Sequence, residues 1–161
     1  MTDLLAEFAD AATRYCEWRD CPAETEIEDA RAAQRHLLRL YHLALDLRQV
    51  DDAPEVDYER VDHDAWKSAY ERFANLPVGF YHAVAEPLDT DAEEVDLMML
   101  DVADDLADIF RDVSGGLLLY RAGHLESAEW EWAWSFQNHW GAHAAAAIHA
   151  LHCWFAREDQ W

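Results

Sequence analysis

Residues 125–156 read LESAEWEWAWSFQNHWGAHAAAAIHALHCWFA, and this stretch decides the fold. From residue 132 to 156 it contains no Asp, Glu, Lys or Arg, although 29% of the whole chain is charged. A helix that is apolar around so much of its circumference needs neighbours on several sides. We therefore predict one long helix over about 125–156, which is either the central helix of a bundle or part of a homodimer interface. Tryptophan is favoured at interfaces, and the candidate interaction face comprises Trp130, Trp132, Trp134, Trp140 and Trp154.

The charge-free part of this stretch is long enough to cross a bilayer, since 25 residues form a helix about 38 Å long. It also holds Ser135, Gln137, Asn138 and four histidines, which are too many polar groups for a lone membrane span. We therefore predict a buried helix and no membrane insertion.

The preceding segment predicts a second long helix, over 91–122, which a capping box at residues 90–93 would begin and Gly123 would end. On a helical wheel Asp101, Asp105, Asp108 and Asp112 line one side, with Asp104 at its edge. Like charges at this spacing repel by a few tenths of a kcal/mol per pair, on the order of the effect in isolated helices. Solvation is the simplest compensation, so the stripe is interpreted first as a water-exposed face.

We expect the two long helices to form an αα-hairpin and the rest of the chain to supply further helices. Capping residues and apolar spacing predict helices over about 2–21, 25–46 and 64–74, with one or two helical turns at 80–86 and an acidic loop at 49–63. A compact domain of this size has a radius of gyration of only ~15 Å, whereas each long helix measures about 40 Å. We expect an all-α, elongated antiparallel bundle of four to six helices, with residues 1–161 as a single domain without a linker.

Clustered carboxylates and paired histidines also allow a metal site. His139 and His143 lie four residues apart on one helix face, but the segment between them lacks the glutamate of a zinc-protease motif. Their simplest interpretation is that of core histidines bonded to neighbours. The alternative is a divalent-metal site, for which the candidate ligands are Asp101, Asp104, Asp105, Asp108, His139 and His143.

The segment Asp105-Leu106-Ala107-Asp108 is similar to the second metal motif, E-x-x-D, of all-α nucleotide pyrophosphohydrolases, but their E-E-x-x-E motif is absent here. That resemblance implies a magnesium-dependent phosphohydrolase as an alternative function. Such an enzyme needs the aspartate stripe to face a pocket, and a second carboxylate-bearing helix to oppose it.

The net charge of the chain excludes some classes of binding partner. Twelve basic residues against 34 acidic ones give a net charge of −22, which excludes a phosphate-binding surface for nucleic acids and attraction to anionic membranes. The three cysteines fit no metal or redox spacing, which favours the cytoplasm. The acidity is also compatible with halophilic adaptation. The leading hypothesis is a non-enzymatic association module that contacts a second copy of itself or a basic partner protein.

A further set of residues carries a resemblance to a known family. These are Asp104-Asp105-Leu106-Ala107-Asp108-Ile109, Gly116-Leu117, Tyr120-Arg121-Ala122-Gly123, Ala128, Trp130, Trp132, Ser135-Phe136 and Trp140-Gly141. Over about residues 80–155 the chain resembles the bacterial proteins of the Domain of Unknown Function 5063 family. The resemblance implies a small soluble bacterial protein, with no established activity, cofactor or catalytic residue.

Overall fold

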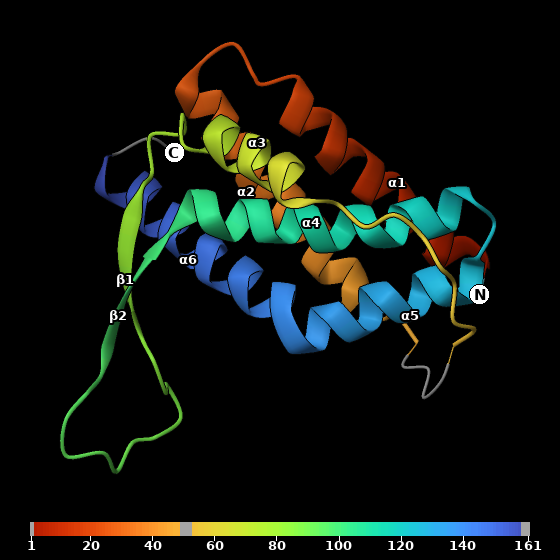
Figure 1. Cartoon of the computed structure of the whole chain (residues 1–161). Coiled ribbons are helices and arrows are strands. Elements are labelled where there is room, and N and C mark those ends of the chain that lie inside the picture. Colours follow the sequence, from red (N-terminus) through yellow and green to blue (C-terminus); the bar gives the residue numbers. More distant parts are fainter. Residues whose placement is uncertain (1, 49–52, 159–161) are drawn as a thin grey trace.

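The computed structural model describes residues 2–48 and 53–158 (Figure 1). This part of the chain is mostly helical and contains one small two-stranded sheet. Its elements are α1 (Thr2–Asp20), α2 (Glu26–Ala44), α3 (His63–Phe73), β1 (Phe80–Val84), β2 (Leu97–Asp101), α4 (Val102–Arg121), α5 (Leu125–Ser135), the π-helical turn η1 (Phe136–Trp140) and α6 (Gly141–Arg157).

The helix boundaries follow the capping signals in the sequence. Thr25 caps α2 by accepting a hydrogen bond from the Glu28 backbone N–H, and Asp62 caps α3 in the same way. Gly123, with a φ of 87°, turns the chain after α4, where a left-handed residue is needed. Helices α4 and α5, which this turn joins, pack against each other. Residues 53–62 contain no helix or strand, as expected, while residues 49–52 of the predicted loop lie outside the described part.

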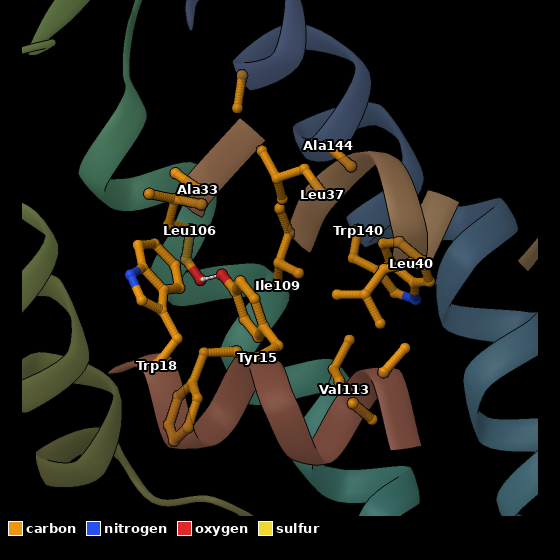
Figure 2. Close-up of a cluster of buried hydrophobic side chains, with 14 of the residues drawn as sticks. Tyr15, Trp18, Ala33, Leu37, Leu40, Leu106, Ile109, Val113, Trp140 and Ala144 are labelled. Atoms are coloured by element: carbon orange, nitrogen blue, oxygen red, sulfur yellow. Dashed lines mark hydrogen bonds between the residues drawn. The ribbon is translucent and has the colours of Figure 1, made fainter. Parts of the chain in front are cut away.

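Helix α4 lies at the centre of the helical body and packs against α1, α3, α5 and α6 (Figure 1). Figure 2 shows part of its core, where Leu106, Ile109 and Val113 meet side chains from α1, α2 and α6. The hydroxyl of buried Tyr15 donates to the Leu106 backbone oxygen at 2.8 Å. Because α4 has neighbours on several sides, its aspartates meet other elements as well as water.

The tryptophan-rich helix runs along one side of α4 and also contacts α2. Its helical structure extends from Leu125 to Arg157, close to the predicted bounds, but the π-helical turn η1 divides it into α5 and α6. The sequence predicts that this helix is either the central helix of the bundle or part of a homodimer interface. The central position belongs to α4 instead. No helix within the described residues is long and apolar enough to cross a membrane.

The main error of the sequence prediction lies in residues 80–101, which form an antiparallel β-hairpin. Phe80 pairs with Asp101 and Val84 with Leu97, and the hairpin projects from one end of the helical body (Figure 1). Of the predicted helical turns at 80–86, residues 80–84 are therefore strand, and α4 begins at Val102 rather than at 91. Asp101 is the N-cap of α4, through an acceptor bond from the Ala103 N–H. The expected all-α class must accordingly be corrected to a mostly helical fold with a small sheet.

Candidate metal centre

Two histidines and one aspartate converge between α4 and the junction of η1 with α6. Asp108 Oδ2 lies 3.7 Å from His139 Nε2 and 3.6 Å from His143 Nε2. One ligand atom from each of the three residues can be chosen so that all lie within 4.8 Å of one another. These separations are too long for hydrogen bonds. Two ligand atoms bound to zinc at about 2.1 Å with a tetrahedral angle lie about 3.4 Å apart. The two distances from Asp108 Oδ2 are close to this value, whereas the whole set spans up to 4.8 Å.

The other nitrogen of each histidine is held by a further carboxylate. His139 Nδ1 lies 2.7 Å from Asp112 Oδ2, and His143 Nδ1 lies 2.8 Å from Asp105 Oδ1. An ionised carboxylate only accepts, so each Nδ1–H donates and each Nε2 is left with a lone pair in the neutral ring. Both Nε2 atoms lie within 3.7 Å of Asp108 Oδ2. This is the arrangement by which outer carboxylates orient metal-binding histidines.

Asp108 is itself held in place through its second oxygen. Oδ1 accepts a hydrogen bond from Trp66 Nε1 of α3 at 2.8 Å, and the Arg111 guanidinium lies 2.9 Å away. Oδ2 is therefore the oxygen that remains for a ligand near the two histidines. The Asp108 side chain is only 14% exposed, whereas those of His139 and His143 are 36% and 26% exposed, so Asp108 is the most buried of the three.

The π-helical turn places His139. The Gly141 backbone N–H donates to the Phe136 oxygen, five residues back, which widens the helix by one residue at this point. A Cβ atom at Gly141 would overlap the Phe136 oxygen and crowd its ring, so the turn requires glycine there. Single π-helical turns occur frequently at functional sites, and this one contains a candidate ligand.

A pocket of about 970 Å³ adjoins the cluster and is called the hairpin pocket here. Its walls come from Trp66 and Tyr70 of α3, from residues 81–85, 87 and 98–101 of the β-hairpin segment, and from residues between 142 and 149 of α6. Asp104 and Asp105 of α4 also line it. The pocket and the histidine cluster share His143, so a molecule in the pocket would lie beside the candidate metal ligands.

Burial and hydrogen bonding shift several pKa values around the pocket. The hydrogen bond with Asp105 raises the pKa of His143, while partial burial opposes that shift. Burial, followed by the charges of Asp108 and Asp105, raises the pKa of Asp104. Burial and the 2.6 Å hydrogen bond to Asp105 raise the pKa of Tyr81 well above its ordinary value. All three shifts reflect excess negative charge in a partly desolvated region, which a bound cation would offset.

The structure separates the six predicted metal-site residues into two groups. Asp108, His139 and His143 meet, whereas Asp101 caps α4, Asp105 orients His143 and Asp104 lines the hairpin pocket. The interpretation of the stripe as a water-exposed face is wrong, because Asp105 is only 2% exposed and the Asp112 side chain 16%. Both histidines are bonded to neighbouring carboxylates, but they are not core residues as expected, since their side chains are 36% and 26% exposed.

Sequence reasoning left Asp112 and Trp66 out of the site. Asp112 could have been found, because it lies on the same helix face as Asp108, one turn further along. Trp66 carries no such signal, since it donates to Asp108 from a separate helix 42 residues earlier in the chain.

The predicted tryptophan interaction face is partly wrong. Trp132 and Trp140 are fully buried and cannot meet a partner without unfolding. Trp132 donates from Nε1 to the Val113 oxygen at 2.9 Å, which fixes it in the core. Trp134 is 50% exposed and stacks on half-buried Trp130 at 5.8 Å, and Trp154 packs on Phe155. Only Trp130, Trp134 and Trp154 remain as residues of a predicted interface.

Similarity to known proteins shows the fold and the family. No functionally curated protein matches this chain. The crystal structure of protein BF1032 from Bacteroides fragilis is similar, with a TM-score of 0.74 at 18% sequence identity over 93% of this chain and 90% of that chain. At this identity the similarity establishes a shared fold alone. Because the family described as Domain of unknown function (DUF5063) matches residues 1–157, well beyond the expected 80–155, this chain belongs to that family.

Proposed function

We propose that this protein binds one divalent transition-metal ion through Asp108, His139 and His143. The observation that carries the proposal is the position of both histidine Nε2 atoms, 3.6 and 3.7 Å from a single Asp108 oxygen. Each histidine has its Nδ1–H on an outer carboxylate, which leaves both Nε2 lone pairs for a metal once the three ligand atoms close in from their 4.8 Å span.

The ligand types indicate which metal fits. Two imidazoles and one carboxylate suit zinc, iron(II) or manganese(II), whereas magnesium prefers oxygen ligands alone. Three protein ligands leave at least one coordination position for water or substrate, which is typical of catalytic sites. The proposed activity is therefore metal-dependent chemistry on a molecule held in the hairpin pocket.

The nucleotide phosphohydrolase alternative receives less support. Its aspartate stripe does face a pocket, but the opposing helix offers His139 and His143 where that enzyme class has carboxylates. Asp101, Asp104 and Asp105 also line the pocket, and their charge would repel a polyphosphate.

Calorimetric titration of the metal-stripped protein tests the proposal. We expect zinc to bind with a stoichiometry of one and a Kd of about 1 μM or below, and magnesium to bind at least about 100-fold more weakly because it rarely takes nitrogen ligands. His139→Ala should weaken zinc binding strongly, whereas His152→Ala, at an exposed position on α6, should not. Zinc binding no tighter than millimolar, or equal binding by both variants, would contradict the proposal.

Association is a second candidate function, and the projecting β-hairpin supports it better than the tryptophans do. Its exposed apolar side chains are Phe80, Val84, Leu88, Val95, Leu97, Met98 and Met99. Monomeric proteins rarely expose so much apolar surface on one segment, and each strand of a two-stranded sheet has an edge that can pair. The segment 85–96 carries six acidic residues, so a second copy would be repelled at low salt and a basic partner attracted.

Light scattering during size exclusion tests self-association by the hairpin. We expect a dimer in 1 M salt, where repulsion between the acidic tips is screened. The double variant Phe80→Ser, Met99→Ser should be monomeric there, while Leu45→Ser, which changes an exposed leucine outside the hairpin, should still dimerise. A wild-type monomer at both 50 mM and 1 M salt and high micromolar concentration would contradict self-association.

A cytoplasmic location is also proposed. Cys16, Cys21 and Cys153 form no disulfide, which supports a reducing compartment.

A further inference from the structure

The hairpin pocket has the size and lining of a small-molecule binding site. Its volume of about 970 Å³ falls at the upper end of the range of roughly 300–1,000 Å³ for ligand pockets. Most of the wall is apolar, from strand residues such as Ala83 and Leu100 and from Ala142, Ala145 and Ala146 of α6. The three alanines give the α6 wall an apolar surface between His143 and His149, which also line the pocket, so this part fits a hydrocarbon or ring system.

One end of the pocket is acidic. Asp101, Asp104 and Asp105 line it at the start of α4, and no lysine or arginine is found among the described residues of the lining. Asp101 accepts from the Tyr70 hydroxyl at 2.9 Å, and Asp105 accepts from the Tyr81 hydroxyl at 2.6 Å and lies 2.8 Å from His143. Asp101 and Asp105 thus accept hydrogen bonds from neutral tyrosine hydroxyls, which do not cancel their negative charge.

Asp104 differs from its two neighbours. Within residues 2–48 and 53–158 it has neither a hydrogen bond nor an ion pair, although it is partly buried and stands between other carboxylates. The charge of Asp104 is stabilised by attraction from His143 and by its place in the first turn of α4, but neither is a direct hydrogen bond. A cation in the pocket would supply the direct partner that this partly buried carboxylate lacks.

Aromatic rings complete the acidic end. Trp66 and Tyr70 of α3 stack at 5.7 Å with an interplanar angle of 19°, and both line the pocket together with Tyr81. Rings of this kind attract organic cations through their π-electrons, by about 0.5–2 kcal/mol depending on exposure. A site with carboxylates beside aromatic rings binds a cationic ligand more tightly than a neutral or anionic ligand of the same shape.

We propose that the hairpin pocket binds an organic cation with an apolar body, such as an alkylammonium or arylalkylammonium compound, whose cationic group lies against Asp104 and whose apolar part lies between the β-hairpin and the alanines of α6. This inference goes beyond the proposed metal function and stands on the geometry of the pocket alone. Anionic molecules of the same shape are excluded by the three carboxylates.

Calorimetry with three eight-carbon probes tests the inference on protein stripped of metal. We expect n-octylammonium to bind with a stoichiometry of one, and at least about tenfold more tightly than 1-octanol or octanoate, because only the ammonium pairs with Asp104. Equal affinity for the three probes, or the absence of saturable octylammonium binding, overturns the proposal.

Two charge-matched variants separate a specific site from general attraction to an acidic protein. Asp104→Asn should weaken octylammonium binding at least about tenfold while leaving octanol binding unchanged, which also shows that the pocket is intact. Asp89→Asn removes the same charge from the exposed hairpin segment outside the pocket and should change nothing. Equal loss in both variants, or no loss in Asp104→Asn, overturns the proposal.

The outcome is independent of the metal proposal. Zinc titration of the Asp104→Asn variant should keep a stoichiometry of one and lose far less affinity than His139→Ala, since Asp104 acts on the three converging ligands only through its charge. If the wild-type protein binds zinc but not octylammonium, only the organic-cation proposal is rejected. If it binds octylammonium but not zinc, only the metal proposal is rejected.

Discussion

Asp108→Asn is expected to weaken zinc binding by at least about 100-fold, because outer-sphere partners alone change metal affinity by 10–100-fold and Asp108 is proposed as a direct ligand. The metal-free variant should be as stable as the wild type or more stable. Asparagine keeps an oxygen that can accept from Trp66 and face Arg111. It also removes one charge from the row of carboxylates on α4, where like charges repel.

Paired zinc titration and urea denaturation in chelator measure both effects. Asp112→Asn is the matched comparison, since Asp112 orients His139 without being a ligand, and it should weaken zinc binding by only about 10–100-fold. If Asp108 had a purely structural role, Asp108→Asn would lower the free energy of unfolding and leave the zinc affinity unchanged. Normal zinc affinity in Asp108→Asn, together with a marked loss of stability, would contradict the account.

Gly116→Ala is expected to lower the free energy of unfolding by about 2–3 kcal/mol, the upper part of the range for overpacked cores. A Cβ at Gly116 would overlap the indole of Trp132, which is fully buried and fixed by its hydrogen bond to Val113. The indole cannot yield without breaking that bond or displacing Phe8, which packs on it at 4.7 Å. The steric effect outweighs the gain of about 0.5–1 kcal/mol that alanine ordinarily brings to a helix.

Gly115→Ala provides the control in the same turn of α4. The nearest atom to a Cβ there is the Tyr58 hydroxyl at 3.3 Å, at the end of a side chain that can shift. This variant should remain within about 1 kcal/mol of the wild type. Urea denaturation of the two variants tests the prediction, and equal stability of both would show that the contact between α4 and Trp132 is not as close as described.

The helical part of the fold could be predicted from the sequence because its signals are local. Thr25 caps its own helix, Gly123 supplies its own turn, and the apolar spacing of residues 125–156 indicates a helix directly. The hairpin could not be found in this way. Its strands expose many apolar side chains, so they lack the alternation of a half-buried strand, and residues 90–93 imitate a capping box.

The sequence could predict which site residues share a helix face, but not which helix faces come together. A helical wheel correctly put Asp105, Asp108 and Asp112 on one side of α4, and His139 with His143 on one side of another helix. Which side meets which depends on packing between elements far apart in the chain. Trp66 and Tyr81 belong to elements whose positions no local pattern gives, so the stripe could not be recognised as partnered.

Anomalous X-ray scattering at the zinc edge, from crystals grown with zinc, tests the central claim most directly. The account predicts one strong peak about 2.0–2.2 Å from His139 Nε2, His143 Nε2 and Asp108 Oδ2. Zinc found only elsewhere, for example beside exposed Cys153 and its neighbour His149, with no peak between these three side chains, would contradict it.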